Sequence, residues 1–467
     1  MNNSTGQSTL QLIIPLLVIL LFTLSFGYFM PAMSIGKTLA VAAGIILFMV
    51  SFTSSQAALY ILIFSMLLGP EIIVGKTGGA SLGRGITLRV DDFILLIIGF
   101  GWLARMAIHK ELGLFLKTPL NKPIAFYILA SLISTLIGAL MGRVDLKTGL
   151  LFVLKYFQYM IIYFMVVNHV QEKKQIQYFL WALLFTCVAV SILGIAQIPG
   201  GERISAPFEG EGGEPNTFGG YLIFMMAIGM GLFLTTNLWK ERLIYGGISI
   251  IAFIPFLFTE SRASYLAFFP MLLVFVLLSE KRKLVVLFLL FLAVLLSLAA
   301  PQKVRDRIAF TFTQSPHPSQ VQIGEMRLDT STSARLRSWQ DVLKNTVKHP
   351  ILGFGVTGYH FVDAQYPRVL VETGIIGMCS FIILLAFIFK QGNMVFKEAN
   401  DLFHRGLSMG FLAGFIGLLV HAVGANTFII VRIMEPFWFV LAMVVIIPQL
   451  ESESPEERRA ESTEQRA

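Results

Sequence analysis

The sequence predicts an all-α protein, a polytopic transmembrane helix bundle of about 12–14 spans with one large extracytoplasmic loop that contains short amphipathic helices. Three observations predict this class. Hydrophobic residues make up 55% of the 467 residues and charged residues only 14%, whereas about a quarter of an ordinary soluble domain is charged. The apolar residues form runs long enough to cross a membrane. A single long polar interval, residues 301–368, interrupts these runs.

The apolar runs give the order of the predicted spans. A membrane-spanning helix needs roughly 20 mostly apolar residues, and about fourteen runs qualify. They lie at residues 10–30, 38–53, 57–73, 92–108, 123–141, 148–167, 176–197, 217–238, 243–258, 263–279, 284–300, 369–389, 406–424 and 431–449. The predicted domains are therefore the first eleven spans within 1–300, the loop at 301–368, the last spans within 369–449 and a disordered cytoplasmic tail at 450–467.

The basic residues of the short loops predict the orientation. Cytoplasmic loops carry an excess of lysine and arginine, and alternate short loops here share such an excess. Its members are Lys110, Lys117, Lys122, Lys173, Lys174, Lys240, Arg242, Lys281, Arg282, Lys283, Lys390, Lys397 and Arg405. Both termini are then cytoplasmic and the loop at 301–368 is extracytoplasmic. Three cations on the opposite side, Lys76, Arg84 and Arg89, weaken this asymmetry.

Composition and motifs exclude several classes of protein. The two cysteines, Cys187 and Cys379, lie inside apolar runs, so a disulfide framework or a metal–thiolate site is not predicted. The net charge of +8 comes from residues between the spans and does not indicate nucleic-acid binding. The sequence contains no GxxxxGK[ST] or HExxH motif, which argues against an ATP-driven transporter or a grafted zinc hydrolase.

A few charged residues lie where a membrane disfavours them. Lys155 lies well inside the sixth predicted span, where a charge costs at least about 2.5–3.5 kcal/mol. It either extends to the interface or faces a substrate. Glu260 and Arg262 fall where the ninth span meets the tenth. They either pair with each other or, as we favour, Arg262 presents its guanidinium group to phosphate oxygens.

Two further segments supply arginines on the same extracytoplasmic side of the predicted bundle. Arg203 is the lone cation of a glycine-rich loop before the eighth span, which is either a flexible tether or folds Arg203 over the anionic group that Arg262 holds. In the long loop, Ser333 is predicted to cap a helix that carries Arg335 and Arg337. Its apolar face is predicted to comprise Leu336, Trp339, Leu343 and Val347, as in an interfacial amphipathic helix.

Candidate acid–base residues stand at the entry to the twelfth span. His360 and Asp363 could serve as general bases, although exposed residues of these types are more often merely solvated. Glu372 lies one turn after Arg368 and could pair with it. His421, within the thirteenth span, is predicted to form a hydrogen bond between helices.

Several segments resemble the O-antigen ligase and polymerase family, membrane glycosyltransferases that use undecaprenyl-diphosphate-linked sugars. They occur in the family's order across the middle and later parts of the chain. The segments are LRVDDFILL, LKYFQYMIIYF, ERISAPF followed by EPNTFGGYL, SRASYL, RLRSWQDVLKNTVKHPILGFG and AQYPRVLVETGIIG. The last two are the most specific.

The resemblance implies an inverting, metal-independent glycosyl transfer without a cofactor at the outer face of the cytoplasmic membrane. Arg203 and Arg262 match the family arginines that hold the donor's diphosphate, and we expect Arg335 or Arg337 to join them in a common cavity. Ligases commonly carry a His-Asn pair where this chain has Asp363 and Ala364. The segment is therefore more similar to the polymerase branch.

Two activities and one other class of protein stay open. A polymerase would join lipid-linked repeat units, whereas a ligase would move a finished glycan onto a lipid A-core or another acceptor. A lipid-linked sugar transporter or flippase would have as many spans, but its charges should lie at the midplane of two related halves. The expected partners are the lipid-linked glycan donor, a glycan or glycolipid acceptor, the bilayer and other polysaccharide-assembly membrane proteins, with no nucleic acid.

Overall fold

The computed structural model describes residues 35–73, 87–108, 117–207, 209, 213–299, 302, 305–306, 309–310, 314–315, 317–318, 320–323 and 326–452. Helices dominate these residues, and two short antiparallel strand pairs connect some of them. The predicted all-α class is confirmed.

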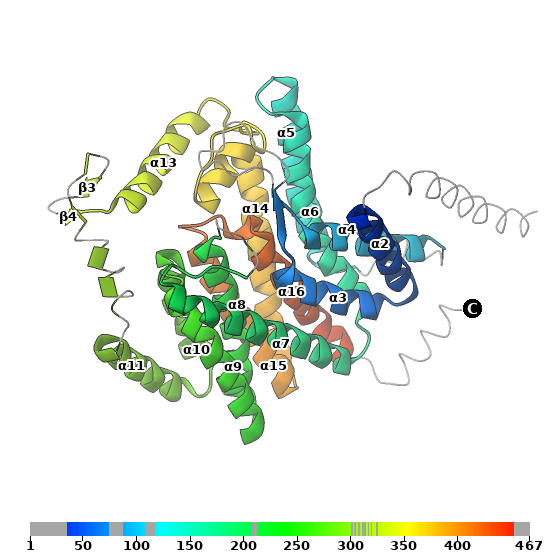
Figure 1. The fold of residues 1–467 in the computed structure, drawn as a ribbon, viewed down its shortest axis with the longest axis vertical. Helices are drawn as coiled ribbons and strands as arrows, with labels where there is room; N and C mark the ends of the chain where they lie inside the picture. Colours follow the sequence, from blue (N-terminus) through cyan, green and yellow to red (C-terminus); the bar gives the residue numbers. More distant parts are fainter. Residues whose placement is uncertain are drawn as a thin grey trace, which may run out of the picture.

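The first part of the chain forms helices of which α2, α3 and α4 lie on one side of the bundle, at the right in Figure 1. Asp145 caps one of them, α6, by accepting a hydrogen bond of 2.9 Å from the backbone N–H of Thr148. Ser54 caps α3 in the same way through the N–H of Ala57. The elements are α2 (Ile35–Thr53), α3 (Ser55–Leu68), β1 (Glu71–Ile73), β2 (Thr87–Arg89), α4 (Val90–Ile108), α5 (Asn121–Leu140), α6 (Leu146–His169), α7 (Lys173–Gln197) and η3 (Ile198–Gly200).

Three helices form the buried centre: α8 (Pro215–Thr235), α15 (Leu402–His421) and α16 (Val431–Ser452). In the most apolar stretch of 18 residues, the buried share is 89% for α8, 72% for α15 and 83% for α16. A Cβ at Gly231 of α8 would lie 2.4 Å from the carbonyl oxygen of Gly406 on α15. Small residues thus let the two backbones approach closely, as is common between helices in membranes.

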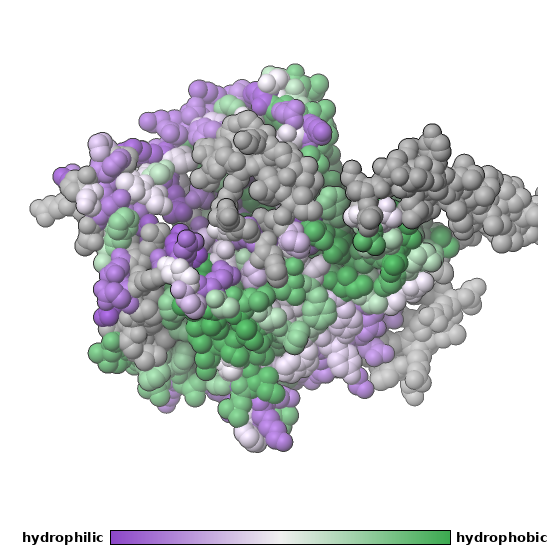
Figure 2. All heavy atoms as spheres, viewed as in Figure 1, coloured by the Kyte–Doolittle hydropathy of each residue, from purple (hydrophilic) through white to green (hydrophobic). Residues whose placement is uncertain are grey.

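The remaining elements follow α8 in the chain. They are α9 (Trp239–Phe258), α10 (Arg262–Leu278), α11 (Arg282–Ala299), β3 (Gln322–Ile323), β4 (Met326–Arg327), α13 (Thr330–Thr346), α14 (Gln365–Glu398) and η5 (Thr427–Ile429). In Figure 1, α13 lies outside the main bundle, on the same side as the start of α14. Figure 2 shows hydrophilic residues gathered over α13 and hydrophobic residues over the helices around α8 and α10.

Gly374 divides α14 into two helical pieces. Its φ of 65° lies in the left-handed region, which glycine adopts without steric cost. A Cβ there would lie 2.4 Å from the carbonyl oxygen of Ile351. The break allows the N–H groups of Ile375 and Ile376 to donate to Pro350 and Ile351. The polar segment before α14 is thereby bound to the middle of that helix.

The predicted spans agree with the helices in position. Each predicted interval from 38–53 onward falls on a described helix, and eight of these helices are long and apolar enough to cross a membrane. The interval 10–30 and the tail after residue 452 lie outside the described residues. The third span was predicted to reach residue 73, but α3 ends at Leu68 and is followed by Gly69 and Pro70. Proline lacks the N–H that a continuing helix needs.

The polar helix α13 differs from its prediction in its N-cap. The N-cap is Asp329 rather than Ser333, whose hydroxyl group instead donates to the carbonyl of Leu328 and accepts from the N–H of Val321. Leu343 and Val347 of the predicted apolar face are exposed, and the interfacial position of this face stays a prediction. The buried residues of α13 are Ser333, Val342 and Thr346.

Candidate functional site

The short connection between α9 and α10 brings Arg203 and Arg262 to one place. Arg203 donates to the backbone carbonyls of Thr259 (3.2 Å) and Glu260 (3.1 Å). Arg262 is the first residue of α10, which Ser261 caps through the N–H of Ser264. Glu260 has a φ of 49°, an uncommon conformation for a residue with a side chain. The two arginines therefore lie within a few residues of the same tight turn.

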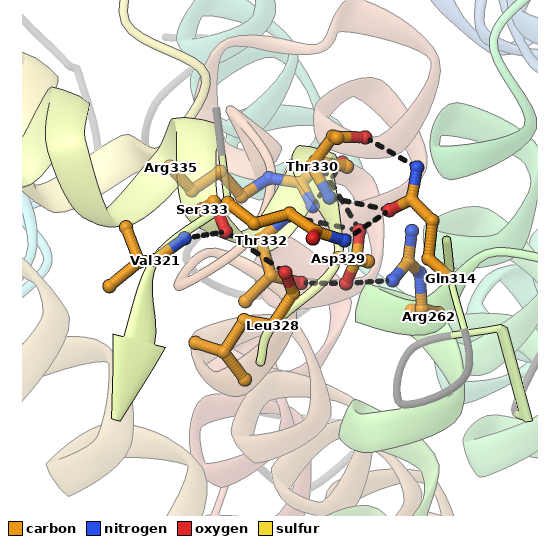
Figure 3. Close-up of polar contacts among 11 residues, drawn as sticks. Arg262, Gln314, Val321, Leu328, Asp329, Thr330, Thr332, Ser333 and Arg335 are labelled. Atoms are coloured by element: carbon orange, nitrogen blue, oxygen red, sulfur yellow. Dashed lines mark hydrogen bonds and ion pairs between the residues drawn. The ribbon is translucent and has the colours of Figure 1, made fainter. Parts of the chain in front are cut away.

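Asp329 connects this turn to α13. Its carboxylate pairs with the guanidinium group of Arg262, and the two side chains are 0% and 18% exposed. It also accepts hydrogen bonds from the N–H groups of Ser331 (3.0 Å) and Thr332 (3.2 Å) and from the Thr332 hydroxyl group (2.6 Å). Figure 3 shows these contacts converging at the start of α13.

The surroundings of Asp329 keep its carboxylate ionised. Burial by itself would raise the pKa of Asp329, but the hydrogen bonds from Arg262 and Thr332 outweigh burial and hold that pKa below its ordinary value. The start of a helix adds to this effect, because its N–H groups favour negative charge. A buried anion is thus balanced by a guanidinium group, two N–H groups and a hydroxyl group.

Arg335 joins the same network one turn later. Its guanidinium group donates to the hydroxyl group of Ser331 (3.3 Å) and pairs with Asp363 (3.1 Å), just before α14. Arg337 is exposed. Two residues of a helix point in directions about 200° apart, so Arg337 lies on the other side of α13. Arg203 contacts the turn that precedes Arg262, and Arg335 is connected to Arg262 through Ser331 and Asp329.

The two candidate general bases have different surroundings. Asp363 is paired with Arg335, and its side chain remains 44% exposed. His360 is exposed and its ring lies 4.0 Å from that of Tyr359, centre to centre. Both residues lie in the segment that leads into α14.

Arg368 and Glu372 form a buried pair at the start of α14, 3.2 Å apart, as predicted. Glu372 also accepts from the N–H of Thr357, and the Arg368 guanidinium group lies 5.9 Å from the ring of Phe152 and 5.8 Å from that of Phe361. The pair therefore holds the preceding polar segment against α14 and α6.

Two other sequence predictions concern residues within the bundle. Lys155 lies 3.5 Å from the carboxylate of Asp92 on α4, so its charge has a partner inside the protein. His421 on α15 is hydrogen bonded through Nε2 to Ser264 on α10 (3.2 Å) and through Nδ1 to Thr427 (2.8 Å). The predicted hydrogen bond between helices is confirmed.

Sequence reasoning missed Asp329 and a set of buried charges that includes Arg89, Asp91, Arg432 and Glu435. The run DTSTS after Leu328 contained a signal, because aspartate is as good an N-cap as serine. The buried charges were visible as RVDD and VRIMEP at the starts of apolar runs.

A hollow of about 410 Å³ lies away from the candidate site. It is lined by Val276, Arg282, Lys283, Val286, Leu287 and Leu290, at the end of α10 opposite to Arg262, and the lining is mostly apolar. The polar contacts around Arg262 and Asp329 identify the candidate site instead, and the common cavity predicted for its arginines stays a prediction.

A comparison with protein families gives a match for the region that contains Arg262 and Asp329. Residues 247–382 match the O-antigen ligase family. The O-antigen ligase match begins within α9 and ends within α14, so it includes Arg262, Asp329, Arg335 and Asp363. Arg203 precedes it. No curated protein matches the chain. The family and the apolar helices together indicate a polytopic membrane protein of O-antigen ligase type that acts in polysaccharide biosynthesis.

Proposed function

We propose that the protein is a membrane glycosyltransferase that polymerises undecaprenyl-diphosphate-linked oligosaccharide units at the outer face of the bacterial cytoplasmic membrane. The O-antigen ligase match supports transfer from a lipid-linked glycan in general. The polymerase branch is favoured because Asp363 and Ala364 stand where ligases commonly carry His-Asn.

The environment of Asp329 carries the proposal. Its carboxylate is surrounded by a guanidinium group, two N–H groups at the start of a helix and a hydroxyl group, which are the groups that bind phosphate oxygens in proteins. In this proposal Asp329 is the internal counter-ion of the donor-free enzyme. A diphosphate would take its place beside Arg262, with Arg203 and Arg335 close to it.

The chemistry of the transfer accounts for the arginines. The acceptor hydroxyl oxygen forms a bond to the anomeric carbon while the bond from that carbon to the diphosphate oxygen breaks, so configuration inverts. The hydroxyl proton goes to a general base, and the lipid diphosphate leaves with additional negative charge. Arginines near this charge stabilise it without a metal ion, because they are placed before the reaction begins.

The general base is assigned to Asp363, with His360 as the alternative. Asp363 lies one residue before Ala364, the N-cap of α14, and its pairing with Arg335 holds it beside the diphosphate subsite. Lys155, Arg368 and Glu372 have supporting roles. The pair Lys155–Asp92 joins α6 to α4, and Arg368, paired with Glu372 within α14, contacts the ring of Phe152 on α6.

A reconstituted system separates the alternatives. The purified protein is placed in vesicles with the undecaprenyl-diphosphate-linked unit as the sole glycan. A polymerase produces longer lipid-linked chains, and a chelator of divalent metals leaves the rate unchanged. A ligase yields no product until a lipid A-core acceptor is added. Movement of the lipid between leaflets with no new glycosidic bond would contradict the proposal and indicate a transporter.

Two neighbouring arginines test the site within this assay. Arg335→Ala should lower kcat/KM at least about tenfold, since a charge-assisted contact is worth roughly 1.5–3 kcal/mol. Arg337→Ala is the matched control on the other side of α13 and should change it less than about twofold. Equal losses in both variants would show that the contacts around Asp329 do not mark the diphosphate subsite.

A further inference from the structure

A set of buried and half-buried charged side chains lies inside the bundle beside the segment that carries Arg203. None of them contacts the reacting atoms in the proposed transfer, in which only Lys155 and its partner Asp92 have a supporting role. They come from β2, α4, α6, α16 and the segment before α8, and they comprise Arg89, Asp91, Asp92, Lys155, Glu209, Arg432 and Glu435. Burying such charges is costly unless they are paired and hydrogen bonded.

Arg432 is the connecting residue of this set. It is 0% exposed and donates to the carbonyls of Leu67 (3.1 Å), Gly69 (3.2 Å) and Pro207 (2.7 Å). Its Nε lies 3.6 Å from the carboxylate of Glu209. One planar guanidinium group thus connects α16 to the end of α3 and to the segment at residues 207–209.

That segment is the continuation of the one that carries Arg203. Three residues lie between Arg203 and Pro207. Between them, the N–H of Ile204 donates to the carbonyl of Phe258 (3.2 Å), and Ser205 exchanges two hydrogen bonds with the side chain of Gln197. Ile204 is 1% exposed. The segment that carries Arg203 is therefore held by hydrogen bonds to the end of α9, to the end of α7 and to Arg432.

Loss of Arg432 would worsen the charge balance of the set. With every member ionised, Arg89, Lys155 and Arg432 face four carboxylates, which leaves one negative charge in excess. Without Arg432 the excess would be two. Glu435 is fully buried, and neither of its carboxylate oxygens has a hydrogen bond within the described part of the chain. Removal of the charge of Glu435 should therefore be tolerated, whereas removal of the charge of Arg432 should not.

We propose that Arg432 is a positioning residue for the donor site: it fixes the segment at residues 203–209 so that Arg203 reaches the turn between α9 and α10. This inference rests on the proposed function, because Arg203 is taken to contact the donor's diphosphate. Arg432 itself touches no reacting atom. It acts through a carbonyl group and a carboxylate on that segment.

The test separates positioning from charge balance. Arg432→Met alone should unfold at a lower temperature, because it leaves the carboxylates with less compensation. The double variant R432M/E435Q returns the set to the single excess negative charge of the unchanged protein, so its unfolding temperature should return toward that of the unchanged protein. Its affinity for undecaprenyl diphosphate should nevertheless stay about tenfold weaker, since the segment has lost its hydrogen bond and its ion pair to α16. Glu435→Gln alone, the matched control, should bind like the unchanged protein.

A second variant covers the case in which the double variant fails to fold. Arg432→Lys keeps the charge but has no planar fork, so it should fold and still bind undecaprenyl diphosphate several-fold more weakly. Wild-type affinity in either R432K or a folded R432M/E435Q would overturn the inference and leave Arg432 as a charge-balancing residue only.

A readout without donor distinguishes failure of this inference from failure of the proposed function. Cysteine in place of the buried Ile204 (I204C) should react with a maleimide faster in the R432M/E435Q background than in the E435Q background. Unchanged reactivity overturns the positioning role. If reactivity rises but R203A binds undecaprenyl diphosphate normally, the positioning holds and the assignment of Arg203 to the donor is wrong.

Discussion

At the scale of single residues, Asp329 has two roles that can be separated by mutation. It caps α13 and it neutralises Arg262. Asparagine caps helices as well as aspartate does but carries no charge. Asp329→Asn should therefore keep the helix and strengthen the binding of undecaprenyl diphosphate several-fold, since the donor no longer displaces a carboxylate. The affinity is measured by titration in nanodiscs.

Asp329→Ala is the control, because it removes both the cap and the charge. It should cost about 0.5–2 kcal/mol of stability through the lost cap alone. Weaker donor binding by the asparagine variant would show that the ion pair with Arg262 supports the site rather than occupying it.

The same carboxylate predicts a dependence on pH. The pKa of Asp329 in the folded protein lies below its ordinary value of 3.8. For a carboxyl group shifted in this direction, the stabilisation is complete above the ordinary value and is lost as the pH falls through the lower folded value. Protease cleavage within the loop at 301–368 should therefore accelerate below about pH 4. The asparagine variant should lack this acceleration, and an identical profile in both proteins would contradict the assignment.

At the scale of elements, the break in α14 requires glycine. An alanine at position 374 would have to adopt the left-handed φ, and its Cβ would lie 2.4 Å from the carbonyl oxygen of Ile351. Gly142 offers a control, because its φ is 70° but a Cβ there has nothing within 4 Å. We expect Gly142→Ala to cost roughly 1–2 kcal/mol and Gly374→Ala clearly more. Thermal unfolding of the two purified variants measures the difference, and equal losses would refute the steric explanation.

The sequence predicts the helices better than their ends or their contacts. Apolar runs give the spans because membrane thickness fixes the length of a helix. The end of α3 was missed since the run of apolar residues continues past Gly69 and Pro70 into β1. The side of α13 that packs against the protein was not predicted, because it carries Ser333, Val342 and Thr346 and only one of these is a large apolar residue.

The candidate site was predictable only in part for a similar reason. Arg203 and Arg262 stand in local motifs, and both reach the same turn. Their partner Asp329 is 67 residues from Arg262 in sequence, and Arg432 contacts a carbonyl 365 residues away. Such pairs depend on how helices pack against each other, which local patterns do not specify.

At the scale of the whole molecule, the orientation in the membrane is still a prediction from the loop charges. Cysteine in place of the exposed Gln340 on α13 should react with an impermeant maleimide added to intact cells. Cysteine in place of the exposed Glu398 at the end of α14 should react only after the cells are opened. Both variants are made with Cys379 replaced by serine, because that thiol is exposed. The opposite result would invert the predicted topology and remove the site from the outer face.

The turn between α9 and α10 also limits how this chain can change in length. Only three residues connect the helices, and Thr259, Glu260 and Ser261 are all hydrogen bonded. Because this connection is short and fully hydrogen bonded, an inserted residue would shift the register of α10. Each added residue would rotate the guanidinium group of Arg262 by about 100° around the helix axis. Relatives of this protein should therefore vary in length elsewhere and keep this spacing constant.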